Sequence, residues 1–265
     1  MPELTEPQIR LGIFLGLFAL LAMMEVFAPR RELSAVKSRR WITNWIIVII
    51  DSAVLRLIFV GAAVGAASWA QMSGTGLFNL VDVPLWFAVL VSFVVLDFAI
   101  WLAHVASHKI PVLWKVHRMH HSDVDIDVST AIRFHPIEIV LSMVWKVIIV
   151  IALGAPAVSV LVFEIVLNAA AMFNHSNMKL PLAADRILRW IVVTPDMHRV
   201  HHSIVHQETD SNYGFNLAIW DRMFGTYIDQ PKDGHDAMTI GLAECQDERP
   251  TQVWWSLKIP FLTLR

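Results

Sequence analysis

Eight of the chain's 12 histidines fall in three short clusters with fixed spacing. These clusters are His104-x-x-x-His108, His117-x-x-His120-His121 and His198-x-x-His201-His202. Imidazole is a common ligand of first-row transition metals. Residues at positions i, i+3 and i+4 of a helix lie on one face, so each cluster can direct its rings the same way. The spacing therefore predicts metal binding.

The number of rings predicts more than one ion. One ion takes about four to six ligands, so eight imidazoles are best explained by two. A zinc hydrolase would need an acidic residue inside a cluster, and none of the three has one. A metal transporter would need ligands near the middle of a membrane segment, and these clusters follow segment ends. A pH sensor explains the repeated spacing less well than a metal pair does.

The composition indicates a membrane protein. The chain has 265 residues, of which 56% are hydrophobic and 17% charged, whereas soluble domains carry about 25% charge. The net charge of -2 gives no reason to expect a nucleic-acid partner. Cys245 is the single cysteine, which excludes an intrachain disulfide and a multi-thiolate metal site.

Apolar stretches predict the elements that carry the clusters. They cover about residues 11–27, 42–69, 85–103, 139–153 and 157–173. The last two form a hairpin over 139–173, and each is shorter than the roughly 20 residues of a full crossing, so whether they cross stays open. Asp51 and Arg56 are candidates for an ion pair. The predicted fold is all-α: an integral membrane helical bundle of four to five segments, in a single domain over 1–265.

Charge predicts the orientation. The segment 30–40 holds five cations, while the segment 71–84 holds none, and cationic loops favour the cytoplasm. This orientation places every histidine cluster on the cytoplasmic side. The more polar chain beyond Ser176 is expected to form a cytoplasmic helical cap, with the catalytic region over about 97–229.

Several polar residues are candidates for holding the ligand rings in place. Asp97 lies on the helical stripe of His104 and could accept a ring N–H or pair inside the bundle. Asp196, Asn212 and Asp221 are further candidates, although Asn212 and Asp221 could equally cap helices. His135 precedes Pro136, and a ring-holding role and a structural role at a helix start are equally expected. His206 and His235 are expected on the surface.

The clusters and their flanks resemble the fatty acid hydroxylase superfamily, which includes sterol desaturases and lipid hydroxylases. The matching flanks are His121-Ser122, Ser129-Thr130-Ala131-Ile132-Arg133-Phe134-His135-Pro136-x-Glu138, Asn174-His175-Ser176-Asn177, Asn212-Tyr213-Gly214-Phe215 and Trp220-Asp221-x-x-Phe224-Gly225-Thr226. The resemblance covers about residues 85–229. It implies that the eight cluster histidines and His175 are the metal ligands and catalytic residues. Some relatives carry another histidine where this chain has Ala171, which leaves one coordination position to water or an outer group.

The resemblance also implies an activity. It predicts an enzyme, an oxidoreductase with two iron ions (zinc being an alternative in a purified sample) that uses O2 to hydroxylate or desaturate a lipid C–H bond. Electrons are expected from a separate donor, a cytochrome b5 or a ferredoxin with its reductase. The substrate stays open among sterols, acyl chains, sphingoid or ether lipids and carotenoids. The competing hypothesis is a non-catalytic membrane metal protein for storage or sensing. An oxygenase requires an apolar tunnel from the bilayer to the metals, and a store requires a polar path to water.

Overall fold

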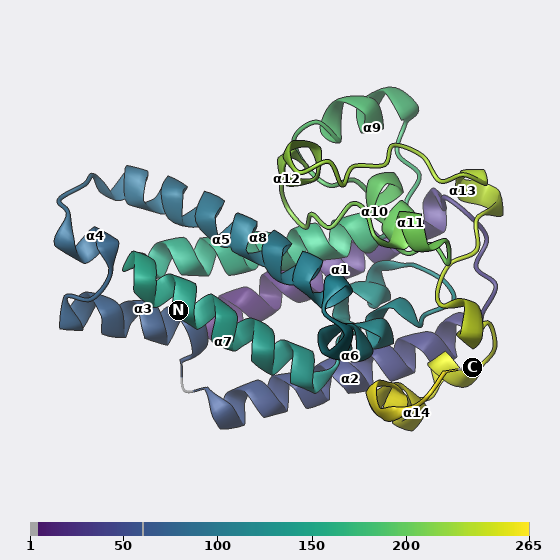
Figure 1. Cartoon of the computed structure of the whole chain (residues 1–265), viewed down its shortest axis with the longest axis horizontal. Coiled ribbons are helices and arrows are strands. Elements are labelled where there is room, and N and C mark those ends of the chain that lie inside the picture. The colour runs from purple at the N-terminus through teal and green to yellow at the C-terminus, as the bar shows by residue number, and fades with distance from the viewer. Residues whose placement is uncertain (1–4, 60, 265) are drawn as a thin grey trace.

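Long apolar helices dominate the computed structural model, which describes residues 5–59 and 61–264 (Figure 1). Five stretches are long and apolar enough to cross a membrane: Glu6–Phe27 (α1), Lys37–Leu80 (α2 to α4), Leu85–Lys109 (α5), Pro136–Leu153 (α7) and Ala157–His175 (α8). No strand occurs among the described residues. The structure confirms the predicted all-α membrane bundle.

The second stretch, expected over about 42–69, consists of more than one helix. Helix α2 (Lys37–Ile58) ends at Ile58, and α3 (Ala62–Ser73) and the short α4 (Leu77–Leu80) follow. Gly61 and Ala62 have positive φ angles of 75° and 46°, a backbone conformation that interrupts a right-handed helix.

The expected Asp51–Arg56 pair does not form within α2. Asp51 is buried and Arg56 is exposed, and the ion pairs of the described residues do not include it. Five residues along a helix turn by about 140°, so the two side chains leave from different faces.

The turn between α7 and α8 anchors the end of the bundle away from the histidines. Gly154 ends α7 with φ 63°, and Gly76 approaches it so closely that a Cβ on Gly76 would lie 2.2 Å from the Gly154 backbone nitrogen. Helices α7 and α8 have 18 and 19 residues, so each spans about 27–29 Å, close to the thickness of a bilayer core. Both are longer than the predicted stretches.

Ion pairs fix the other end of α2 to the chain that follows the second histidine cluster. Arg40 is fully buried, and its guanidinium donates to Asp123 and Asp127 at 2.7 Å each. Arg30 pairs with Asp196, so cations used to predict orientation also hold the fold together. The cytoplasmic placement of the clusters stays a prediction.

Short helices gather at that same end. Helix α6 (Pro111–His121) follows α5, and the 3-10 helix η1 (Val128–Ile132) precedes α7. After α8 come α9 (Leu182–Leu188), α10 (Pro195–His201), α11 (His206–Thr209), α12 (Ile219–Met223), α13 (Gly234–Ala237) and α14 (Val253–Lys258). In Figure 1, α9 to α13 form a cap over one end of the long helices, with α14 near α2.

Candidate metal centre

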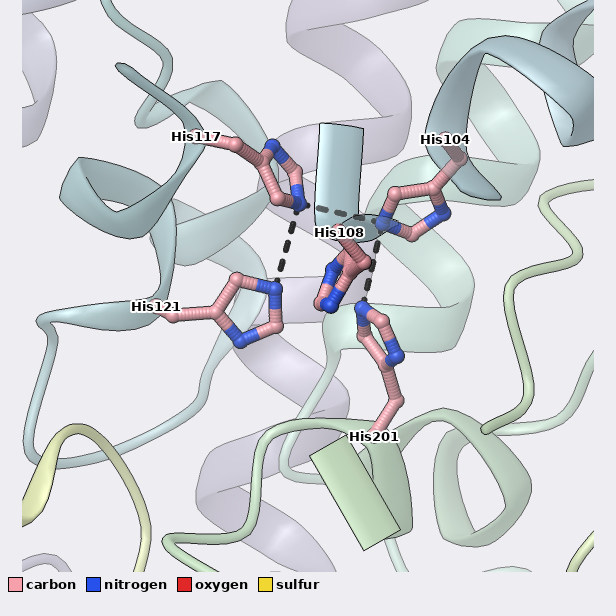
Figure 2. Close-up of side chains that lie close together, drawn as sticks. All are labelled: His104, His108, His117, His121 and His201. Atoms are coloured by element: carbon pink, nitrogen blue, oxygen red, sulfur yellow. Dashed lines mark hydrogen bonds between the residues drawn. The ribbon is translucent and has the colours of Figure 1, made fainter. Parts of the chain in front are cut away.

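The structure brings all nine predicted ligand residues together in two groups. We call them the five-histidine group (His104, His108, His117, His121 and His201) and the four-histidine group (His120, His175, His198 and His202). Within each group one nitrogen per ring lies within 4.8 Å of the others. Figure 2 shows the five rings of the first group turned toward a common centre from α5, α6 and α10.

Each His-x-x-His-His cluster divides its rings between the two groups. In the second cluster the outer residues, His117 and His121, join the five-histidine group and His120 joins the other. The third cluster does the reverse, with His201 alone in the five-histidine group. Adjacent residues of a helix differ by about 100°, so the fourth and fifth positions diverge enough to reach two centres.

Backbone carbonyls fix the protonation of several rings. Nδ1 of His104 lies 2.7 Å from the carbonyl oxygen of Tyr213, and Nδ1 of His201 lies 2.6 Å from that of Ser211. A carbonyl oxygen only accepts, so Nδ1 carries the proton and the Nε2 of a neutral ring is bare. These two Nε2 atoms are 3.1 Å apart, so two lone pairs face one another.

The four-histidine group repeats this arrangement. His120 donates from Nδ1 to the Arg133 carbonyl oxygen at 3.1 Å, and His175 donates to that of Ala171 at 2.7 Å. Their Nε2 atoms are again 3.1 Å apart. Metal–nitrogen bonds of about 2.1 Å at right angles would place two ligand nitrogens about 3.0 Å apart. The bare nitrogens therefore fit a transition-metal cation in each group.

Unsatisfied nitrogens give the same indication. His202 is buried, yet neither of its ring nitrogens has a hydrogen-bond partner, and Nε2 of His108 also lacks one. A buried polar atom without a partner costs free energy of about 1–3 kcal/mol. A bound cation would remove the cost at the nitrogens that face it.

Burial keeps these rings neutral. It lowers the pKa of His201 to about 3, and the neighbouring His117 adds to the effect. Burial, followed by neighbouring imidazoles, also holds the pKa values of His120, His121, His198 and His202 well below the usual 6.5. Neutral imidazole is the form that binds a metal.

Two carboxylates hold rings of the five-histidine group. Oε1 of Glu138 lies 2.6 Å from Nδ1 of His117, and Oδ1 of Asp210 lies 3.3 Å from Nδ1 of His108. Sequence reasoning assigned neither residue this role. Glu138 belongs to one of the matching motif flanks, and its carboxylate in the first turn of a helix could have indicated a partner for a ligand ring. No sequence pattern pointed to Asp210.

Three of the five residues proposed to hold ligand rings form other hydrogen bonds instead, either within the cap or between the cap and α5. Asp97 accepts from Nε1 of Trp220 at 2.8 Å. Asp221 accepts from the backbone N–H groups of Tyr213 and Gly214, so it acts on His104 only through the Tyr213 carbonyl. Asn212, with φ 49°, ties together the backbone of Met197 and Ile228.

The other two also have structural contacts. His135 caps α7 by accepting from the Ile137 N–H and lies 3.1 Å from the Leu257 carbonyl oxygen. Asp196 forms ion pairs with Arg199 and Arg30, and Nε2 of His235 lies 3.6 Å from its carboxylate. His235 was expected on the surface, but it is buried, because α13 packs its ring against α10.

The four-histidine group has one ligand fewer, as the alanine at position 171 led us to expect. Ala171 is buried one turn before His175, and its methyl side chain offers no ligand atom. Phe134 stacks on His120 with ring centroids 4.4 Å apart, and Phe215 lies 5.0 Å from His104. Aromatic rings thus cover both groups.

Two cavities, of about 290 and 200 Å³, lie elsewhere. Arg39 and Glu248 help to line the first, and Phe78 and Gly154 help to line the second. Neither cavity is lined by a cluster histidine. The apolar tunnel that would separate an oxygenase from a store stays a prediction.

Known lipid hydroxylases and monooxygenases are similar to this chain. The chain is 34% identical over 149 residues to ornithine lipid hydroxylase OlsE of Rhizobium tropici, covering 56% of this chain and 44% of that protein. It is 34% identical over 154 residues to the alkylglycerol monooxygenase of Homo sapiens, covering 57% and 33%. Cholesterol 25-hydroxylase of Rattus norvegicus is 25% identical over 142 residues, covering 52% and 46%. The chain thus spans less than half the length of these relatives.

No solved structure matches this chain. The model of one family, Fatty acid hydroxylase, matches residues 89–226, which is just over half of the chain and contains all nine clustered histidines. The match agrees with the resemblance over 85–229. The chain therefore belongs to the fatty acid hydroxylase family.

Proposed function

We propose that the chain is a membrane-bound oxygenase that uses two iron ions, O2 and external electrons to hydroxylate or desaturate an aliphatic C–H bond of a lipid. The observation that carries this proposal is the two groups of buried imidazoles with bare nitrogens facing one another. The family match and the lipid hydroxylases and monooxygenases among the relatives support it.

Bound iron would supply the redox chemistry that acid–base side chains lack, which is O2 activation and cleavage of an unactivated C–H bond. Hydroxylation consumes the substrate, O2, two electrons and two protons, and yields an alcohol and water. Desaturation consumes the same reagents and yields an alkene and two waters. The two electrons come from a protein donor, for which a cytochrome b5 or a ferredoxin with its reductase is the proposed class.

The chain's own residues prepare the site for this chemistry. Carbonyl oxygens and the carboxylates of Glu138 and Asp210 hold the Nδ1 protons outward, so Nε2 faces the centre. Burial keeps the rings neutral without a metal. Phe134 and Phe215 exclude water from the sides that they cover.

Mass spectrometry of lipids tests the proposal. Cells with and without the protein are compared for species that gain about 16 or lose about 2 mass units, as oxygen insertion or hydrogen removal requires. His120→Ala should abolish the product and lower the metal content of the purified protein. His206→Ala is the matched control, because that ring is exposed and outside both groups.

Two results would contradict the proposal. If His120→Ala formed the same amount of product as the unmodified protein, the histidine groups would have no part in the reaction. A protein that binds its metals but changes no lipid when supplied with electrons and O2 would favour the storage or sensing alternative.

A further inference from the structure

An exposed apolar surface covers one side of the cap. We call it the α9–α12 patch, and it consists of Leu182, Ile187, Trp190, Ile191, Met223 and Phe224. Each of these side chains is more than half exposed. A water-facing cap rarely exposes so many large apolar side chains together, so the patch calls for a partner.

The two halves of the patch form one surface. The Ala218 N–H donates to the Ile191 carbonyl oxygen at 3.0 Å, which joins α12 to the chain after α9. The Arg222 guanidinium lies 4.2 Å from the Trp190 ring centroid and 3.8 Å from that of Tyr227. Figure 1 shows α9 and α12 next to each other on the side of the cap above α5.

Contacts with α5 show how far along that helix the patch lies. Trp220 donates to Asp97 at 2.8 Å, and the Phe224 ring stacks on Trp101 with centroids 4.7 Å apart. Asp97 lies 12 residues before the end of α5 at Lys109, which is about 18 Å along the helix axis. The α12 side of the patch is therefore level with the middle of α5, not with its end.

The middle of α5 is a membrane-crossing segment. A bilayer core of about 30 Å takes roughly 20 helical residues, so a core that begins at Leu85 ends near His104. Both contact points, Asp97 and Trp101, lie inside that range. Leu90, 11 residues before Trp101, lies within about 20° of it around the axis of α5 and is an exposed apolar side chain, so the apolar surface continues on that face of the helix.

From this depth and continuity we propose that the α9–α12 patch is immersed among the acyl chains of the leaflet that holds the histidine groups. Its partner is the bilayer itself. This placement departs from the expectation that the chain after Ser176 forms a cap on the cytoplasmic side of the helices.

Charges around the patch are arranged for this environment. The buried Asp185 and Arg189 of this segment pair with each other. Arg222 is stacked between two aromatic rings, which shields its charge. Lys179 and Arg186 are exposed and can extend toward lipid headgroups, as long cationic side chains do at an interface.

Immersion of the α9–α12 patch would fix the position of the metal ligands along the membrane normal. The chain between the two halves of the patch carries His198, His201 and His202, together with the carbonyl groups of Ser211 and Tyr213 that hold ligand rings. Anchoring both halves in lipid would hold this part of the metal centre at the membrane surface.

Fluorescence quenching in nanodiscs tests the proposal without relying on activity. Ile187→Cys, Ile191→Cys and Met223→Cys are made separately in a Cys245→Ala background, and each is labelled with the same maleimide fluorophore. Lys232→Cys and Glu244→Cys are matched controls at exposed polar positions of the cap. Both faces of a nanodisc are open to solvent, so only lipid or protein can shield a label from dissolved iodide.

Labels in the patch should be quenched by phosphatidylcholine that carries a nitroxide on its acyl chain. Their iodide quenching constants should be about tenfold below those of the controls, because an anion does not enter hydrocarbon. Iodide quenching equal to the controls would overturn the proposal, and so would shielding from both quenchers, which would indicate a second copy or a protein partner. Each labelled variant must keep the metal content and elution volume of its unlabelled parent.

Discussion

At the scale of single residues, the two histidine groups differ in what holds their outward nitrogens. In the five-histidine group, His117 and His108 face carboxylates. In the four-histidine group, the described contacts of Nδ1 are backbone carbonyl oxygens, at His120 and His175. An imidazole whose outward N–H faces a carboxylate is a stronger metal ligand than one whose N–H faces a carbonyl oxygen. We therefore expect the five-histidine group to bind its metal more tightly.

Glu138 offers a direct test of this difference. Glu138→Leu removes the acceptor of the His117 Nδ1 proton, so the ring loses the contact that orients it toward the metal. The metal affinity of the five-histidine group should fall about 10- to 100-fold, the usual cost of removing such a partner. Glu138→Gln keeps an oxygen acceptor and should fall between Glu138→Leu and the unmodified protein. Competition with a chelator of known affinity measures the change.

Glu244→Gln serves as the control for this series, because Glu244 is exposed and belongs to neither histidine group. If Glu138→Leu held its metals as firmly as this control, the carboxylate would have no part in metal binding.

A second prediction concerns His235 and pH. Burial lowers the pKa of His235 in the folded protein to about 4, against a usual value of 6.5. The unfolded chain therefore binds the proton first, and this residue's contribution to stability, present above pH 6.5, is lost as the pH falls toward 4. The His235→Gln variant has no titrating ring at this position, so it does not lose stability in this way as the pH falls. The gap in thermal midpoint between the unmodified protein and the variant should shrink from pH 7 to pH 4.5, and a constant gap would exclude the ring's titration.

At the scale of elements, local spacing was the most informative part of the sequence. Spacings of three and four residues place His117, His120 and His121 on one side of a short helix, and no distant residue has to be known for that. How these rings divide between two centres depends on where α5, α8 and α10 meet α6. That meeting is decided by long-range packing, which the spacing does not contain.

The residues that hold the rings were harder to predict for the same reason. Asp97 shares a helical stripe with His104, but the carbonyl that accepts the His104 proton belongs to Tyr213, 109 positions along the chain. Asp210 reaches His108 across 102 positions. Likewise, the apolar run over 42–69 concealed the break at Gly61, because a turn between apolar helices needs no polar residues.

A third prediction concerns how α1, α7 and α8 are held together. Both oxygens of the buried Glu164 are used, one by Lys146 and one by Arg10, at 2.7 Å each. Glu164→Leu leaves two cations facing each other inside the bundle, and we expect a loss of about 3 kcal/mol in unfolding free energy. Glu164→Leu with Lys146→Met should recover part of that loss. Denaturation in detergent micelles measures both.

The control for this set also involves Arg10. Glu6 forms an exposed pair with Arg10, so Glu6→Gln should change the stability by less than about 1 kcal/mol. Equal effects of Glu6→Gln and Glu164→Leu would mean that the buried pairs do not hold these helices together.

At the scale of the whole molecule, the chain builds its chemistry at one end of a membrane bundle. The carboxyl ends of α5 and α8, all of α6 and the amino end of α7 meet there, and the cap supplies the remaining ligands. The opposite end is closed by the contact of Gly76 with Gly154. The metal centre and this turn therefore lie toward opposite ends of the long helices. Labels at the two ends can therefore show which end faces which side of the membrane.

The last prediction is that the histidine end faces the cytoplasm. The segment 30–40 lies at that end, and its five cations favour the cytoplasmic side, although Arg40 and Arg30 are also engaged with carboxylates of the fold. Lys232→Cys marks the cap and Gln71→Cys marks the opposite end, both in a Cys245→Ala background. In sealed vesicles of known orientation, a membrane-impermeant maleimide should label Gln71→Cys from the external side and Lys232→Cys from the cytoplasmic side. The reverse pattern would place the metal centre outside the cell and would require an electron donor on that side. Labelling of both positions from one side would contradict a bundle that crosses the membrane with its two ends on opposite faces.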